Sequence, residues 1–196
     1  MSASATGRHP APGGLRFVQD LVNTAAGRDP GPDPFQDAGR ADSWLRAALG
    51  AWSAAASQPA PGIELDDSDL VPLRDHRERL RTALRVQPGS PSTAGSAATP
   101  DAPATGEVTA RILLTSTPGG LVRYEPFESG WRAVRGLTTT EALLAQVRGT
   151  WPRLKVCAYP ACGVCFYDAS PNRTRVWHDT RTCGNRANLR ASRARK

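Results

Sequence analysis

The sequence predicts an α+β protein: a mostly helical N-terminal domain with a small β-hairpin or sheet, followed by a compact C-terminal module ending in a basic helix. Three observations support this fold class. Apolar residues recur at helical spacing through much of residues 15–150, a Pro-Gly-Gly turn separates two short apolar runs, and all four cysteines lie between positions 157 and 183. A chain of 196 residues can form one substantial core and one small additional module.

The first elements are predicted to be a mobile arm and two helices. Residues 1–14 are small, polar and contain Gly and Pro, so we expect a disordered arm. Apolar residues at helical spacing then predict a helix from Leu15 to near Gly27. A second helix is expected to begin at an N-cap supplied by Asp42 or Ser43.

A third helix is predicted after a cluster of aspartates at positions 66, 67 and 69, where the helix dipole favours acidic side chains. Leucines at helical spacing through Leu84 would form its buried face. The arginines of this helix are interpreted as a mostly solvated face: Arg74, Arg77, Arg79, Arg81 and Arg85. Residues 86–108 contain almost only Pro, Ser, Thr, Ala and Gly, and are predicted to be a disordered insertion because they cannot bury enough apolar surface.

The remainder of the N-terminal domain is predicted to contain a hairpin and a last helix. Residues 111–115 and 121–124 flank the Pro-Gly-Gly turn and are expected to pair as two strands. Trp131–Val134 is predicted to add a third short strand. Thr138 and Glu141 have the spacing of a capping box and are expected to open the last helix. Residues 15–150 show no convergent catalytic chemistry, so we expect a packing domain with a polar surface.

Two short-spaced pairs of metal-binding residues dominate the C-terminal module, residues 151–196. Cys157 and Cys162 form a C-x4-C pair, and His178 and Cys183 form an H-x4-C pair after a spacer of fifteen residues. Structural zinc takes four such ligands in a tetrahedron, with no open position for catalysis. The spacing therefore predicts a Cys3His site for Zn2+ in a treble-clef-like finger, with Gly184 allowing the backbone to bend around the metal.

Cys165 has three possible roles, because it also forms a C-x2-C pair with Cys162. The favoured interpretation is a buried apolar residue beside Phe166. The alternatives are a zinc ligand in place of His178, or a redox partner of Cys162. The large side chains of the spacer are expected to form a miniature core: Phe166, Tyr167 and Trp177.

The basic charge of the chain is concentrated in the same module. Residues 151–196 contain ten Lys or Arg and two acidic residues, a net charge of +8, whereas residues 1–150 have a net charge of −1. Such a patch is typical of proteins that bind nucleic acid. The residues after Cys183 are good helix formers, and Leu189 is expected to pack on the zinc core. The candidate nucleic-acid contacts are Arg173 and Arg175 in the spacer and Asn185, Arg186, Arg190 and Arg193 in the helix. For Asn185 and Arg186, a structural role at the zinc knuckle stays open.

Two segments of the chain resemble known families. The run Cys183-Gly184-Asn185-Arg186, together with the C-x4-C pair, resembles the CGNR zinc-finger family over about residues 153–196. Upstream, the chain is similar to the ABATE-type domain that usually precedes this finger. The matching segments are Phe17 with Asp20–Thr24, Trp44-Leu45 and Arg77–Leu80.

The resemblance implies a bacterial, stress-related transcription regulator whose finger binds DNA, although RNA has also been suggested for the family. It places the metal ligands at Cys157, Cys162, His178 and Cys183. The family commonly has cysteine where this chain has His178, which lowers the negative charge of the site by one. Cys165 lies where the family tends to have an apolar residue, which favours the packing interpretation.

These observations lead to a main hypothesis and its alternatives. We expect a zinc-dependent, DNA-binding transcription regulator that contacts double-stranded DNA and is not an enzyme. The alternatives are an RNA-binding protein, or a protein-interaction adaptor with a purely structural zinc finger. The N-terminal domain is a candidate for homodimerisation, and its effector is unknown. Because the sequence shows no signal peptide and no transmembrane-length apolar run, we expect a cytoplasmic, nucleoid-associated protein without membrane contact.

Overall fold

The computed structural model describes most of the chain, in the ranges 9–26, 31–87 and 107–194. Most of the arm predicted at residues 1–14 and of the insertion predicted at 86–108 lies outside the described residues. At their edges the chain is packed more tightly than expected. Ala11 is buried, with its N–H donating to the Gln19 side chain at 2.7 Å. Gln87 is also buried, and its side chain donates to the carbonyl of Leu154.

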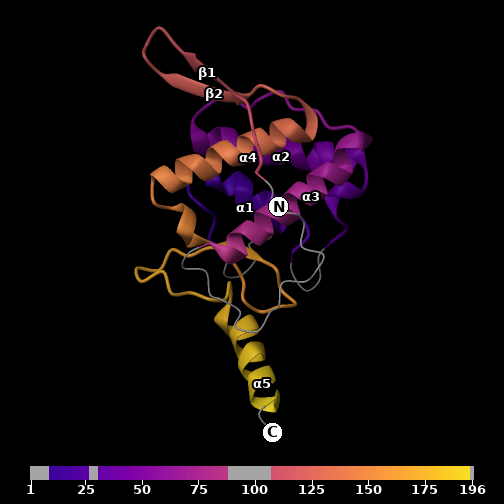
Figure 1. Ribbon diagram of the computed structural model, residues 1–196, viewed down its shortest axis with the longest axis vertical. Helices are drawn as coiled ribbons and strands as arrows, with labels where there is room; N and C mark the ends of the chain where they lie inside the picture. Colours follow the sequence, from indigo (N-terminus) through magenta and orange to yellow (C-terminus); the bar gives the residue numbers. More distant parts are fainter. Residues whose placement is uncertain (1–8, 27–30, 88–106, 195–196) are drawn as a thin grey trace.

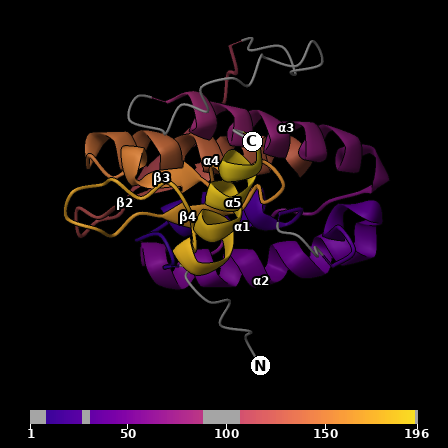
Figure 2. The same ribbon diagram turned by 90° about the horizontal axis from the view of Figure 1, so that it is seen from below.

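Helices make up the body of the N-terminal part (Figure 1). They are α1 (Leu15–Asn23), α2 (Ala38–Ala56), α3 (Asp67–Val86) and α4 (Gly130–Val147), with a short 3-10 turn, η1, at Pro34–Gln36. α1 contacts α2, α3 and α4, and Figure 2 shows it between α2 and α3. Because α1 is surrounded, nearly its whole length is buried. Its apolar residues and those of its neighbours form the main core, which includes Phe17, Leu21, Trp52, Leu73 and Leu137.

The starts of two helices follow from their caps. α3 starts at the predicted aspartates, and two of them form a capping box: the Asp66 side chain accepts a backbone N–H of the first turn, and the Asp69 side chain accepts the Asp66 N–H. α2 begins earlier than predicted, at Ala38, because the Asp37 side chain accepts the Arg40 N–H at 2.9 Å. Asp37 was overlooked as a cap because the apolar periodicity of this helix starts a turn later.

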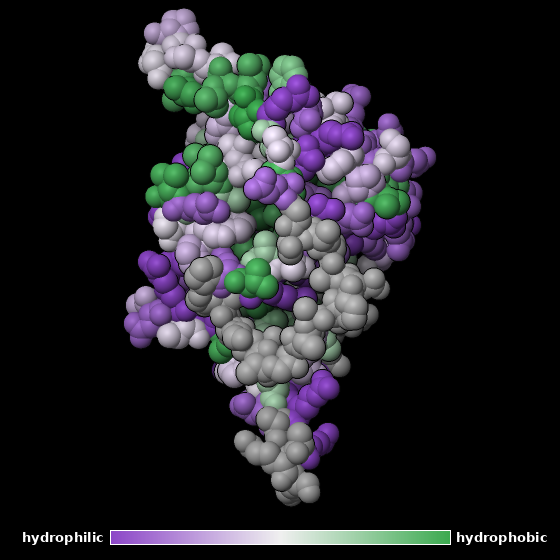
Figure 3. Space-filling view, in the orientation of Figure 1, coloured by the Kyte–Doolittle hydropathy of each residue, from purple (hydrophilic) through white to green (hydrophobic). Residues whose placement is uncertain are grey.

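A protruding hairpin confirms the predicted pair of strands. β1 (Ile112–Ser116) and β2 (Val122–Pro126) are antiparallel, with Leu114 opposite Tyr124. Gly120 in the turn has φ +78°, a conformation that favours glycine. The hairpin extends beyond the helices, and its apolar side chains form an exposed patch (Figures 1 and 3). Leu114 and Val122 are 67% and 59% exposed.

The third strand predicted at Trp131–Val134 is wrong, because these residues form the first turn of α4. The start of this helix is fixed by α3. The Asp69 carboxylate accepts the Trp131 N–H at 3.0 Å and lies against Gly130, where a Cβ would be 2.4 Å from its Oδ1. Gly130 also has φ +59°, so glycine is required twice over. This cap comes from a residue 62 positions away, beyond the reach of local sequence patterns.

The capping box predicted at Thr138 and Glu141 is also wrong, since both residues lie inside α4 and are buried. The Thr138 hydroxyl donates to the Val134 carbonyl within the helix and contacts His76 Nε2 at 2.8 Å. Glu141 accepts hydrogen bonds from Trp52 and Tyr124. Both side chains therefore join α4 to neighbouring elements instead of starting it.

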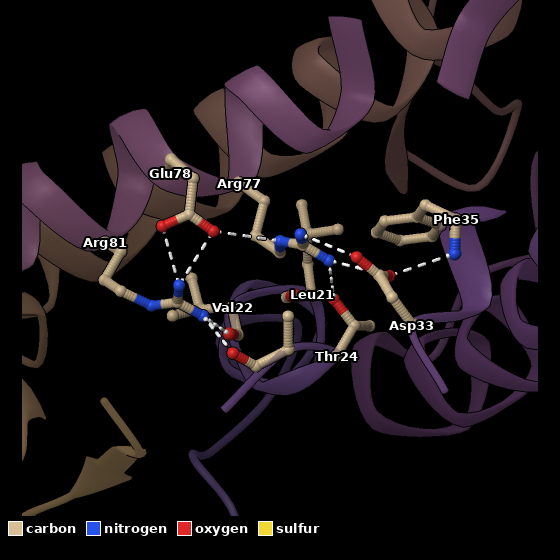
Figure 4. Close-up of polar contacts among 9 residues, drawn as sticks. Leu21, Val22, Thr24, Asp33, Phe35, Arg77, Glu78 and Arg81 are labelled. Carbon is tan, nitrogen blue, oxygen red and sulfur yellow. Dashed lines mark hydrogen bonds and ion pairs between the residues drawn. The ribbon is translucent and has the colours of Figure 1, made fainter. Parts of the chain in front are cut away.

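Two arginines of α3 depart from the expected solvated face (Figure 4). Arg77 is 5% exposed and donates to both carboxylate oxygens of Asp33 at 2.9 and 2.8 Å. Arg81 is 8% exposed, pairs with Glu78, and donates to the carbonyls of Val22 and Ala25. The last carbonyls of a helix have no partner within it, so Arg81 supplies donors to the C-terminal end of α1.

Across the described residues, no helix has both the length and the apolar character needed to cross a membrane.

Candidate metal centre

The first two cysteines lie in the turn of a short hairpin. Its strands, β3 (Leu154–Val156) and β4 (Cys165–Tyr167), are antiparallel. The Cys157 N–H donates to the Val164 carbonyl at 2.8 Å, and the Cys162 N–H donates to the Tyr159 carbonyl at 2.9 Å. Gly163 has φ +64°, which lets the chain reverse directly after the second cysteine. These bonds hold both thiols on the same side of the turn.

The other two candidate ligands flank the start of a helix. Asp179 caps a five-residue π-helical turn, Thr180–Gly184, by accepting the N–H groups of Arg181 and Thr182. His178 comes immediately before this cap, and Cys183 lies in the turn, which continues into α5 (Asn185–Ala194). The Cys183 N–H donates to the Asp179 carbonyl at 3.0 Å. The wide turn thus brings the H-x4-C pair together.

The structure brings the four predicted metal residues into one cluster: Cys157, Cys162, His178 and Cys183. Their ligand atoms all lie within 4.8 Å of one another. Nδ1 of His178 is 3.3 Å from the Sγ of Cys162 and 3.6 Å from the Sγ of Cys183. Zinc with Zn–S bonds of about 2.3 Å and a Zn–N bond of about 2.0 Å would place such atoms about 3.5 Å apart. The residues present therefore fit a tetrahedral Zn2+ ion, with Nδ1 as the histidine ligand.

The protonation of the thiols points to the same chemistry. Hydrogen bonding with Cys162 lowers the pKa of Cys157 to about 4, and the same interaction raises the pKa of Cys162. Burial, followed by the charge on Cys157, raises the pKa of Cys183. Three thiols this close cannot all ionise without a compensating cation. A bound zinc ion would supply that charge and keep all three as thiolates.

A buried ion pair shapes the spacer between the two ligand pairs. Lys155 and Asp168 are 2% and 0% exposed, and the lysine Nζ lies 2.9 Å from Asp168 Oδ2. Asp168 also accepts the N–H groups of Ser170 and Arg175 at 3.0 Å each. Burial acts to raise the pKa of Asp168, but hydrogen bonds from Ser170 and Lys155 outweigh it and lower the pKa to about 2. Lys155 therefore does not contribute to the exposed basic surface, although it is one of the ten Lys or Arg counted in residues 151–196.

Arg175, a predicted nucleic-acid contact, makes internal contacts. Its Nη2 donates to the carbonyl of His178 at 2.6 Å, and its guanidinium lies 5.4 Å from the centre of the Phe166 ring. The half-buried side chain thus supports the backbone of a ligand residue. Arg173, the other spacer candidate, is exposed and has φ +53°.

Cys165 lies outside the metal cluster, in the position of a packing residue. It is fully buried against α1 and α3, and burial raises the pKa of its thiol. Asn23, at the end of α1, clamps its backbone. The Asn23 amide donates to the Cys165 carbonyl at 2.9 Å and accepts the Cys165 N–H at 2.8 Å. The favoured interpretation of Cys165 is thus confirmed, and the zinc hairpin shares a core with the helical region across residue 150.

Three expectations about the finger core need correction. Phe166 and Trp177 pack with the ligand cysteines as predicted, but Tyr167 packs with α1 and α3 instead. Gly184 packs closely against Trp177, since a Cβ there would lie 3.1 Å from the ring, so the position favours a small residue and not a bend of the backbone. Leu189 is 58% exposed and does not pack on the zinc core, because α5 extends away from it.

The helix that follows the metal cluster projects from the body of the protein (Figures 1 and 2). Its candidate contact residues are all exposed: Asn185, Arg186, Arg190 and Arg193. Among the described residues, no hydrogen bond joins the side chains of Asn185 or Arg186 to the zinc knuckle. These side chains are therefore free to meet a partner.

Comparison with known proteins agrees with the geometry of this site. Residues 153–196 match the family model of the CGNR zinc finger. The match begins at the hairpin that holds Cys157 and Cys162 and ends with the basic helix, so these residues form a CGNR zinc finger with a Cys3His ligand group. No curated protein matches the chain.

Proposed function

We propose that this protein is a zinc-dependent, DNA-binding transcription regulator that uses α5 to contact double-stranded DNA. The observation that carries the proposal is the placement of this helix. α5 begins two residues after the ligand Cys183 and extends into solvent with its arginines exposed. Its sequence contains no acidic residue. A metal-anchored basic helix of this kind is suited to a polyanion.

The arrangement of the arginines favours a duplex. Arg186, Arg190 and Arg193 are spaced i, i+4 and i+7, which places them along one side of α5. The ten residues of α5 correspond to a helix about 15 Å long. The major groove of B-DNA is wide enough to admit an α-helix. Arg173, exposed on the spacer, would add a phosphate contact near the base of the helix.

RNA binding and protein binding are the alternative functions. Single-stranded RNA is commonly gripped by stacking bases on aromatic rings. Here Phe166 is fully buried, and Trp177 is packed against Gly184, so both rings serve the core of the finger. An adaptor that binds an acidic protein would use the same basic helix without preferring nucleic acid. The competition assay described below distinguishes such an adaptor from a nucleic-acid-binding protein.

We also propose that the protein is not an enzyme. The four-ligand metal group leaves no open coordination position, and Cys165 is buried in the core. The N-terminal helical region fits the ABATE-type domain by its sequence motifs. In the structure, Asn23, Thr24 and Arg77 from these motifs serve to join helices and the zinc hairpin. A role of this region in dimerisation stays a proposal.

The test is a competition assay with the full-length, zinc-loaded protein. Labelled duplex DNA is displaced by unlabelled duplex DNA or by structured RNA. We expect duplex DNA to compete better, and Arg190→Ala with Arg193→Ala to weaken binding by about 1–3 kcal/mol, as for lost nucleic-acid contacts. The matched control is Arg46→Ala, an exposed arginine of α2. Stronger competition by RNA would favour the RNA-binding alternative, and absence of binding to either would favour an adaptor.

A further inference from the structure

A cavity lies where four elements of the helical region meet. Its volume is about 270 Å3, and its walls come from the residues before α1, the C-terminal end of α2, strand β2 and helix α4. This volume lies just below the usual range of small-molecule pockets, about 300–1,000 Å3. The cavity is therefore large enough for a molecule of a few heavy atoms.

One wall carries a buried carboxylate. Glu141 is 1% exposed, and its Oε1 accepts the Trp52 indole N–H at 2.5 Å and the Tyr124 hydroxyl. Burial and the hydrogen bond to Glu141 raise the pKa of Tyr124, so this hydroxyl stays a donor. Both partners are neutral, and no ion pair to Glu141 is found among the described residues. A buried carboxylate without a cation is costly, and such groups are common at binding sites.

The backbone is fitted closely around this carboxylate. A Cβ on Gly14 would lie 1.9 Å from Oε1 and 2.3 Å from Oε2 of Glu141, so only glycine leaves room there. Gly14 is the N-cap of α1, where the helix dipole favours negative charge. Oε2 accepts no hydrogen bond from the described part of the chain. Because Glu141 lines the cavity, this oxygen is the one left to accept a hydrogen bond from a ligand.

The opposite charge lies at the rim. Arg148 and Arg123 line the cavity and are exposed. Arg148 is the C-cap of α4, seven residues after Glu141, so the two Cα atoms lie on the same side of the helix about 10 Å apart along its axis. Leu121 and Val122 of the hairpin also line the cavity, and they are 56% and 59% exposed. The cavity therefore combines a buried carboxylate, apolar side chains and exposed arginines.

We propose that this cavity binds a small zwitterion with an ammonium group at one end and a carboxylate at the other, joined by a short alkyl chain. The ammonium group donates to Glu141 Oε2, and the carboxylate pairs with Arg148 at the rim. The alkyl chain of the ligand covers the apolar side chains of Leu121 and Val122. This assignment is independent of nucleic-acid binding by the finger.

The experiment is calorimetric titration of the full-length, zinc-loaded protein with γ-aminobutyrate, with butylamine and butyrate as probes that each keep one charge. We expect the zwitterion to bind at least about tenfold more tightly than either single-charge probe, since each lost charge-assisted hydrogen bond weakens binding by that order. Glu141→Gln keeps an acceptor for Trp52 but removes the charge, and Arg148→Ala removes the outer partner. Each should weaken binding by about tenfold or more, while Gln146→Ala, an exposed control on the same helix, should have no effect.

Several outcomes would overturn the proposal. One is the absence of heat from γ-aminobutyrate at millimolar concentration. Another is equal binding of all three probes. A third is binding that Arg148→Ala leaves unchanged, and this exposed variant keeps the test valid even if Glu141→Gln fails to fold.

Discussion

Replacing Asn23 with alanine should separate the zinc hairpin from the helical region. The side chain of Asn23 makes the two short hydrogen bonds to the Cys165 peptide groups on the edge of β4, at 2.9 and 2.8 Å, and Gln19 adds a longer one to the same carbonyl at 3.5 Å. Strand β3 pairs with the other edge, so the truncated side chain has no substitute in the sheet. Cys165 itself is fully buried. The variant therefore leaves the buried Cys165 N–H without a partner and its C=O with only the long hydrogen bond from Gln19.

The size of this effect follows from the groups left unpaired. Each buried polar group without a partner costs about 1–3 kcal/mol. With the N–H unpaired and the C=O held only by Gln19, we expect Asn23→Ala to lower the free energy of unfolding by about 1–3 kcal/mol.

The assay is urea unfolding of the zinc-loaded, full-length protein, followed by far-ultraviolet circular dichroism and tryptophan fluorescence. Coincident transitions of the two probes would show that the helical region and the finger unfold together. Asn172→Ala, an exposed asparagine of the spacer, is the matched control and should change stability by less than about 0.5 kcal/mol. A loss for Asn23→Ala as small as that of the control would refute the role of this clamp.

Three further predictions concern the metal, the buried thiol and a buried histidine. Chelation should release one zinc ion per chain and unfold the finger, because zinc binding contributes about 10–16 kcal/mol to the folding of finger peptides. Mass spectrometry measures the zinc content and circular dichroism the unfolding, and an unchanged circular dichroism spectrum would contradict the prediction. In the zinc-loaded protein Cys165 should resist alkylation, since burial raises the pKa of its thiol, and rapid labelling there would instead support a reactive thiol site. Burial, with the charges of Arg135 and Arg79, lowers the pKa of His76 to about 4, so its contribution to stability is complete above about pH 6.5 and is lost as the pH falls toward 4. The stability difference between the wild type and His76→Gln should shrink by about 3 kcal/mol between pH 7 and 4 in urea titrations, and a difference independent of pH would exclude this linkage.

The metal ligands could be predicted from the sequence because both pairs are local. C-x4-C and H-x4-C each fit within one turn, and zinc chemistry accepts few other residues. Burial of the two α3 arginines was also within reach of the sequence. Arg77 and Arg81 occupy the helical positions that continue the buried stripe of Leu70, Leu73 and Leu84. The spacing alone thus indicates two buried cations, whereas the charge of the side chains favours a solvated face.

Other contacts had no local signal. Asn23 meets Cys165 across 142 residues, and Asp69 caps a helix 62 residues away. The pairing of Lys155 with Asp168 joins residues from separate parts of the finger, so each looked like an ordinary surface charge in the sequence. These three interactions depend on how elements meet in space, which local patterns do not encode.

The salt dependence of duplex binding tests the central proposal most directly. Each Lys or Arg that neutralises a phosphate contributes about −0.9 to the slope of log K against log salt concentration. With three arginines on one side of α5 and Arg173 on the spacer, we expect a slope of about −3.6 for the zinc-loaded protein, and a slope weaker by about 2 for the combined Arg190→Ala and Arg193→Ala variant. Binding that does not change with salt, or a slope that the two substitutions leave intact, would contradict a role for α5 in binding DNA.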